Sequence, residues 1–311
     1  MSMLEQDVKR DFVKEENTFR VRKHPQSNRL YHIEISDAVI RQFFSELKDM
    51  STERLEYVPY NRFIAAAKLE EIAGTSFSQT INSILHDRAS GGFTIGVKEQ
   101  TNNIGEYILF STALSHLIGE PNFDAMSGKY YARFTVKDTD NSDSYLRQAY
   151  RRFTLHTDGT FVDEPTDWLL MMKMAEEHAV GGESRLLHLD DWKELDRFIK
   201  DPLASYEFTY KAPASKNVQE EVKRKTFFLK NNNPCICFID QFAYPESIQQ
   251  AKYLRDLSSS MEEDENVIEL KLPTGNLVML NNLFWLHGRA AFEKNVQLHR
   301  ELLRQRGRFL K

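Results

Sequence analysis

Hydrophobic residues in the first 120 positions recur mainly at the three- and four-residue spacing of amphipathic helices. After Asp37, a residue type that often caps helices, one face of a helix carries Val39, Ile40, Phe43, Phe44 and Leu47. The same spacing predicts helices over 63–72, 77–85 and 104–118, with Gly74-Thr75-Ser76 as a break and Gly119 as a stop. Residues 1–35 are polar and charged, so we predict partial disorder there, with 29–36 as the first strand-like alternation.

From Tyr130 onward the apolar pattern changes to short runs typical of strands. We predict strands over 130–136, 168–174, 184–189, 226–229, 235–239, 267–270, 277–280 and 301–309. Two helices interrupt them, at about 192–199 and 246–257. Eight short strands joined by turns are typical of a double-sheet jelly roll. The expected fold class is mainly β with flanking helices (α+β): a helical N-terminal part, 1–120, packed on a double-stranded β-helix core, 121–311, as one structural unit.

Composition and charge exclude several classes of protein. With 41 basic against 46 acidic residues the net charge is −5, so no general positive field predicts nucleic-acid binding. No apolar run is long enough to span a membrane, and the charged N-terminus does not resemble a secretory signal. We therefore expect a soluble cytoplasmic protein. Cys235 and Cys237, two apart on one strand, are expected to be reduced cysteines rather than a disulfide.

One short stretch, 153–160, contains a candidate metal site. His156 and Asp158 are two residues apart, so in an extended strand they point to the same side. His287 follows a distant apolar run and could supply a third ligand, although a core histidine beside Trp285 is the alternative. Two histidines and one carboxylate are the ligand set of non-heme Fe(II) oxygenases. A His-x-Asp tripeptide is common by chance, so this set needs support from elsewhere in the chain.

The last predicted strand contains a row of positive charge. Arg300, Arg304 and Arg306 have the same parity and therefore share one face of an extended strand. Such a row is often a solvated surface. If this face lines the barrel interior, however, the guanidinium groups suit carboxylates, which they bind through paired hydrogen bonds.

Taken together, long blocks of the sequence resemble the glutarate 2-hydroxylase (CsiD-type) family of Fe(II)/2-oxoglutarate-dependent dioxygenases. The matching blocks are 122–134, 141–148, LHTDGT at 155–160, 186–192, 215–218, 239–242, NNLFWLHGR at 281–289 and RELLRQRG at 300–307. They cover roughly residues 110–310, and the N-terminal hundred residues match less well.

The resemblance implies a role for each candidate residue. His156, Asp158 and His287 match the family's iron ligands, and Arg300 matches the arginine that binds the far carboxylate of 2-oxoglutarate. Ser184 stands where related dioxygenases have a threonine at that same carboxylate. Arg304 lies where those relatives bind the anionic end of the substrate, and Arg306 is assigned to the substrate with it.

The implied activity is hydroxylation of glutarate, a small dicarboxylate, at C2. Glutarate, 2-oxoglutarate and molecular oxygen would give L-2-hydroxyglutarate, succinate and CO2, with one oxygen atom in the new hydroxyl group and the other in succinate. The family also suggests a homotetramer and lysine catabolism through glutarate. Two other interpretations stay open: a dioxygenase of the same fold acting on another dicarboxylate or a sulfonate, and a non-catalytic sensor that binds metal or 2-oxoglutarate.

Overall fold

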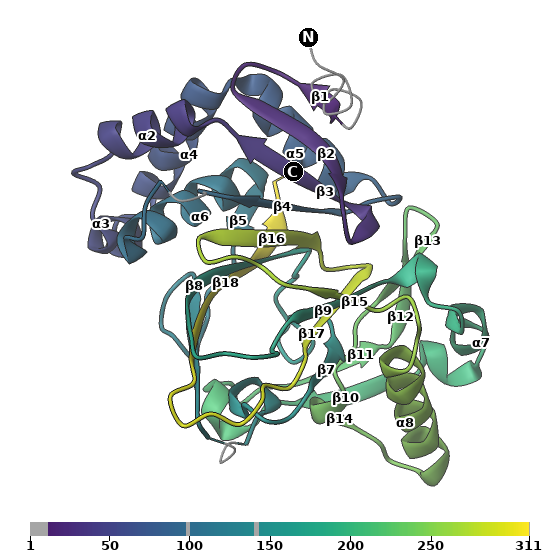
Figure 1. Ribbon diagram of the computed structural model, residues 1–311. Coiled ribbons are helices and arrows are strands. Elements are labelled where there is room, and N and C mark those ends of the chain that lie inside the picture. Colours follow the sequence, from purple (N-terminus) through teal and green to yellow (C-terminus); the bar gives the residue numbers. More distant parts are fainter. Residues whose placement is uncertain (1–11, 98–99, 140–142, 311) are drawn as a thin grey trace.

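Two β-sheets form the core of the molecule (Figure 1). The computed structural model describes residues 12–97, 100–139 and 143–310. The main sheet has the strand order β1-β2-β3-β4-β16-β8-β18-β5, and β6 also pairs with β18. Its strands are β1 (Phe12–Glu15), β2 (Phe19–His24), β3 (Ser27–Ile35), β4 (Gly92–Gly96), β5 (Gly119–Pro121), β6 (Ala132–Lys137), β8 (Trp168–Glu177), β16 (Asn276–Asn281) and β18 (His299–Phe309).

A smaller sheet faces the inner side of the main sheet. It has the order β15-β9-β17-β7, formed by β7 (Phe153–His156), β9 (Ser184–His188), β15 (Ile268–Leu270) and β17 (Trp285–Arg289). One cavity is lined by residues of both sheets, from β6, β8 and β18 on one side and β7, β9 and β17 on the other. This is the predicted jelly-roll arrangement, and it places His156 and His287 on one wall of the cavity and Arg300 and Arg304 on the other.

Both faces of the main sheet are covered, which explains the continuous apolar runs in its central strands. Along β8, Trp168, Leu170 and Met172 belong to the core under the helices, whereas Leu169 and Met171 belong to the core between the sheets. The sequence of a strand buried on both faces is an uninterrupted hydrophobic run rather than an alternation of apolar and polar residues. The sequence therefore showed the strand but not which side chains face the cavity.

The N-terminal part adds strands as well as helices to the core. Its helices are α2 (Asp37–Glu46), α3 (Thr52–Tyr57), α4 (Tyr60–Ala73), α5 (Thr75–His86) and α6 (Ile104–Ile118), and they gather at one end of the molecule (Figure 1). Ser36 caps α2, one residue before the expected Asp37, and accepts a hydrogen bond from the amide of Val39. Gly74, at φ 93°, separates α4 from α5 as predicted.

The prediction of disorder for the leading segment is wrong over residues 12–28, whereas the strand predicted over 29–36 is confirmed as β3. The segment forms β1, β2 and β3, because Phe19, Val21, Ile33 and Ile35 bury one face against the helices. Charged residues on the other face made the segment look polar overall. The part of that prediction covering residues 1–11 lies outside the described residues. Because β3 pairs with β4 and β4 with β16, one sheet runs through both parts of the chain.

The remaining elements lie outside the two sheets. They are β10 (Glu207–Lys211), β11 (Glu221–Lys225) and β14 (Ala243–Tyr244) in a small sheet, the hairpin β12 (Phe227–Lys230) and β13 (Asn233–Ile236), and the helices α7 (Leu195–Ile199) and α8 (Ile248–Glu262). The sequence did not predict β10 or β11, whose charged residues hide the alternation of Phe208 and Tyr210. None of the helices in the described part of the chain combines the length and apolarity needed to cross a bilayer.

Candidate metal centre and cavity

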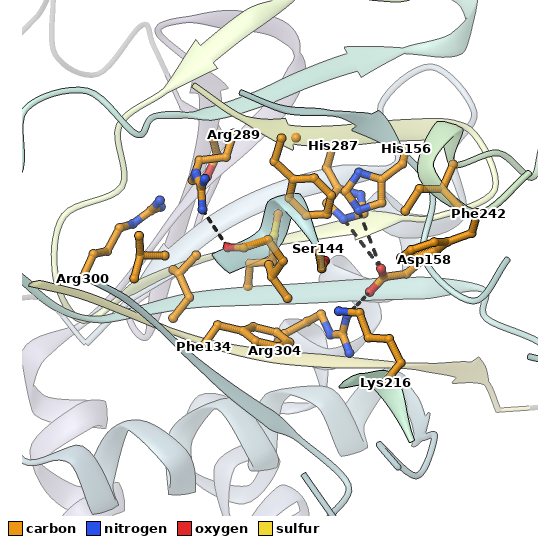
Figure 2. A pocket seen from close by; sticks show the side chains of 18 of the residues that line it. Phe134, Ser144, His156, Asp158, Lys216, Phe242, His287, Arg289, Arg300 and Arg304 are labelled. Atoms are coloured by element: carbon orange, nitrogen blue, oxygen red, sulfur yellow. Dashed lines mark hydrogen bonds and ion pairs between the residues drawn. The ribbon is translucent and has the colours of Figure 1, made fainter. Parts of the chain in front are cut away.

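The three predicted metal ligands lie together. Nε2 of His156 and Nε2 of His287 are each 3.9 Å from Oδ1 of Asp158. The possible ligand atoms of all three residues lie within 4.8 Å of one another, and no other such group is found among the described residues. His287 is 4% exposed and therefore a buried histidine, but it faces the other two ligands rather than apolar core alone. Figure 2 shows the three side chains converging on one point.

Strand pairing brings the two histidines together. Residue His287 of β17 is the direct partner of His156 on the neighbouring antiparallel strand β7. Gly288 permits this close approach, because a Cβ atom there would lie 2.5 Å from the carbonyl oxygen of Phe153. His156 Nδ1 lies 2.7 Å from the carbonyl oxygen of Thr154, so the ring can donate there and keep Nε2 free for a metal.

The loop that carries Asp158 is fixed by one side chain. The amide group of Asn282 accepts a hydrogen bond from the backbone N–H of Asp158 at 2.9 Å. It also donates to the carbonyl oxygens of Asp158 and Thr166, at 3.0 and 2.9 Å. The carboxylate is thus held at a defined place directly after β7.

The protonation states favour metal binding. Burial lowers the pKa of both histidines, that of His287 well below its ordinary value, so the imidazoles are neutral at pH 7. Burial alone would raise the pKa of Asp158, but the guanidinium groups of Arg304 and Arg306 act against it and the net pKa is lowered. Two neutral imidazoles and one carboxylate are the donor set of non-heme Fe(II) sites, so these residues fit iron.

Arg304 is bound to the metal-site carboxylate. Its Nη1 lies 3.1 Å from Oδ2 of Asp158, and its Nη2 donates to the carboxylate of Asp124. The guanidinium also lies over the ring of Phe134, 4.9 Å from the centroid. Arg304 lines the cavity as predicted, but two acids already share its charge.

Arg300 lies in the cavity on the side away from Asp158 (Figure 2). It is 2% exposed, and its Nη1 donates to the carbonyl oxygen of Gly182 at 2.7 Å. Gly182, at φ 72°, packs so tightly on Phe292 that any Cβ would collide with the ring. Ser184, two residues further on, also lines the cavity and is buried.

Arg306 occupies a different position from the other two arginines. Arg306 is buried near Asp124 and Asp158. Burial and Arg304 lower its pKa, the two acids raise it, and the net pKa is lowered. Unlike Arg300, Leu302 and Arg304, it is not among the residues that line the cavity. Arg300 and Arg304 therefore both line the cavity, as their shared parity indicated. The structure shows no cavity contact that would support substrate binding by Arg306.

Two cationic residues of the cavity had no role in the sequence interpretation. Arg289 lies two residues after His287 on β17, so strand parity could have placed it on the same face. Its guanidinium donates to the carbonyl oxygens of Leu146, Gln148 and Arg151. Lys216, in the β10–β11 connection, lines the cavity near Asp158, and a loop position gives no periodic signal that could have identified it.

Apolar side chains form the remaining wall between these charges. Phe134, Met171, Phe242 and Leu302 are among the residues that line it. The cavity therefore has an apolar middle, a pair of arginines on one side, and the metal ligands with Arg304 and Lys216 on the other (Figure 2).

The sequence matches known proteins over nearly its whole length. A model of the CsiD family matches residues 19–309. Glutarate 2-hydroxylase of Klebsiella pneumoniae (strain 342) is 42% identical over 294 residues, which cover 94% of this chain and 90% of the relative. The protein of the same name from Salmonella newport (strain SL254) is 40% identical over 302 residues, covering 96% and 93%.

Solved structures with the same fold include two iron oxygenases. Asparagine oxygenase in complex with Fe(II), 2S,3S-3-hydroxyasparagine and succinate superposes with a TM-score of 0.72 at 13% identity, covering 88% of this chain and 92% of that one. The oxygenase OrfP in complex with Fe and alpha-ketoglutaric acid gives a TM-score of 0.66 at 15% identity, covering 88% and 92%. The fold is shared with these enzymes, and the sequence matches over nearly the whole length establish that this chain belongs to the CsiD family.

Proposed function

We propose that this chain is an Fe(II)- and 2-oxoglutarate-dependent dioxygenase that hydroxylates glutarate at C2. The products would be L-2-hydroxyglutarate, succinate and CO2. The observation that carries the proposal is the His156–Asp158–His287 set at the wall of a cavity with positive charge on two sides. The names of the relatives, glutarate 2-hydroxylases at 40–42% identity, support the substrate.

His156, Asp158 and His287 would hold the iron and leave its other positions open to the cavity. Iron bound there, with 2-oxoglutarate and molecular oxygen, supplies the oxidant that replaces a C–H bond of the substrate by C–OH. Arg304 keeps Asp158 ionised and oriented, and Asn282 fixes the backbone of that ligand. The protein must also hold the substrate tightly, because position decides which C–H bond reacts.

The arginine pair would bind the far carboxylate of 2-oxoglutarate. Arg300 has only a loose acidic partner, since Glu176 Oε2 lies 3.8 Å from its Nε and also binds Lys173. Arg289, its neighbour, has no carboxylate partner among the described residues. Two buried guanidinium groups side by side are costly without an anion, so a bound carboxylate there is strongly favoured. Ser184 would add a hydroxyl donor from β9.

Arg304 would contribute to the substrate side, where the apolar residues between the two cationic groups suit a chain of methylene groups. A five-carbon dicarboxylate has charge at both ends and an apolar middle, which matches this distribution. Arg306 does not line the cavity, and its assignment to the substrate stays a prediction.

The decisive experiment is oxygen consumption by the Fe(II)-loaded protein with 2-oxoglutarate and glutarate. We expect glutarate to stimulate oxygen uptake and to give equal amounts of succinate and 2-hydroxyglutarate. Asp158→Ala should abolish this turnover, because the site loses its only anionic protein ligand and binds iron weakly. Turnover of Asp158→Ala at the wild-type rate and at ordinary iron concentrations would contradict the metal assignment.

The same assay separates the two alternatives. A response to adipate, succinate or taurine that exceeds the response to glutarate would favour a dioxygenase for another small anion. Binding of 2-oxoglutarate without oxygen uptake for any substrate would favour a sensor. The intact set of three ligands together with the buried arginine pair favours the enzyme.

The family resemblance further leads us to propose a homotetramer located in the cytoplasm that acts in lysine catabolism through glutarate. Sedimentation of the purified protein tests the first point, with a mass near four times 36.4 kDa as the expected result. A monomer at micromolar concentration would contradict it.

A further inference from the structure

Arg304 shares its positive charge between two acids, which limits its capacity to bind the substrate. The guanidinium contacts Asp124 and Asp158 at once, so one positive charge faces two negative ones. A carboxylate arriving beside it would meet both acids. Arg304 by itself is therefore a weak anchor for an anion, although it occupies the expected position.

Lys216 provides a positive charge that has no ion-pair partner in the described part of the chain, although Asp158 and Asp124 act on it electrostatically. It lies beside Asp158 and Arg304 on the same side of the cavity (Figure 2). Among the described residues no carboxylate forms an ion pair with it and no hydrogen bond holds its ammonium group. Lys216 is partly buried, and the cost of placing its ammonium group next to a guanidinium falls when a further anion binds beside them. Burial and Arg304 lower the pKa of Lys216 to about 8, while Asp158 and Asp124 act in the opposite direction.

The backbone around Lys216 is fixed, so its position is part of the fold. A 3-10 turn, Ala214–Lys216, ends at Asn217, which has the left-handed φ of 53° that asparagine tolerates. Ser215 donates from its hydroxyl to Asp143 at 2.7 Å and from its N–H at 3.3 Å. These bonds tie the β10–β11 connection to the segment before Tyr145, at the other edge of the cavity.

We propose that Lys216 binds a carboxylate of the substrate and thereby sets the preference for dianionic over singly charged or neutral substrates. This inference rests on the proposed function and deepens it. The arginine pair Arg289–Arg300 serves 2-oxoglutarate, while Lys216, assisted by Arg304, serves the dicarboxylate that is hydroxylated. The substrate carboxylate loses hydration when it enters the cavity, and the ammonium group of Lys216 compensates for this loss with a charge-assisted hydrogen bond.

The test compares Lys216→Gln with Lys223→Gln, a control on the exposed side of β11 in the same hairpin. Lys216→Gln should raise the KM for glutarate about tenfold to a hundredfold, the range for a hydrogen bond to a charged group. The affinity for 2-oxoglutarate, titrated anaerobically into the Fe(II) protein, should stay within about twofold of wild type. Succinate should exceed 2-hydroxyglutarate, because misplaced substrate uncouples the reaction. Lys223→Gln should match wild type throughout.

A second variant, Lys216→Glu, guards against an ambiguous result. It should abolish glutarate-dependent turnover while still binding 2-oxoglutarate, which also shows that the variant is folded. An unchanged KM for glutarate in Lys216→Gln, or a loss that falls on 2-oxoglutarate affinity instead, would overturn the inference. Wild-type protein that does not respond to glutarate at all would overturn the proposed function, so the two failures are distinguishable.

Discussion

Arg300 carries a buried positive charge whose nearest acid is shared with a lysine. Its side chain is 2% exposed, and Gly182 fixes one edge of the guanidinium through a backbone carbonyl. An arginine held this way needs little reorganisation to accept a carboxylate through its free edge. At the scale of single residues, this preorganisation is what distinguishes Arg300 from the other arginines of β18.

We therefore expect Arg300→Ala to raise the KM for 2-oxoglutarate about tenfold to a hundredfold, corresponding to about 1.5–3 kcal/mol for a charge-assisted pair. Steady-state kinetics with saturating glutarate measure this change. Arg308→Ala is the matched control, because Arg308 lies on the same strand but is exposed and pairs with Glu120. An unchanged KM in folded Arg300→Ala would transfer the role to Arg289.

At the scale of elements, helix α6 joins the N-terminal part to the jelly roll. Eleven of its fifteen residues are buried, because it packs between other elements on several sides. His116, near its C-terminal end, is 5% exposed, and its Nδ1 lies 2.8 Å from the carbonyl oxygen of Thr112. Burial lowers the pKa of His116 to about 4.

This burial predicts a loss of stability in mild acid. Between pH 6.5 and about 4 the unfolded chain binds a proton at His116 that the folded chain does not, so the free energy of unfolding falls as the pH falls. One such group contributes a slope of up to about 1.4 kcal/mol per pH unit. Urea unfolding at pH 7 and pH 5 should show a smaller pH difference for His116→Gln than for wild type. Equal pH differences would mean that folding does not lower the pKa of His116.

At the scale of the whole molecule, the site connects the two sheets. The metal ligands His156 and His287 belong to the small sheet, whereas Arg300 belongs to the main sheet. A 2-oxoglutarate molecule bound to both would join the two walls of the cavity.

We accordingly expect two separate increments in thermal stability under anaerobic conditions. Fe(II) alone should raise Tm, and 2-oxoglutarate should raise it further. At a hundredfold excess over its Kd, 2-oxoglutarate should add about 2.7 kcal/mol to the free energy of unfolding. Arg300→Ala should keep the first increment and lose most of the second. Loss of the first increment in that variant would show that Arg300 acts on the metal ligands instead.

The sequence itself determined much of this protein. The period of its apolar residues predicted helices 104–118 and 37–47 and most strands of the jelly roll to within a few residues, because local burial imposes that period. The two-residue spacing of His156 and Asp158 and the shared parity of Arg300 and Arg304 followed from strand geometry alone. Family resemblance assigned His287, which the structure places with the other two ligands.

Only the tertiary structure decided the remaining features. The strands β1 and β2 were hidden, because in β2 just one face is buried and the other carries charged residues. The sharing of Arg304 between Asp124 and Asp158 depends on contacts between segments far apart in the chain. Lys216 reaches the cavity from a loop, where no period constrains the side chain. That it has no ion-pair partner among the described residues becomes visible only once every neighbour has a position. Local patterns fix which face a residue occupies, whereas charge balance in a cavity is a property of the folded chain.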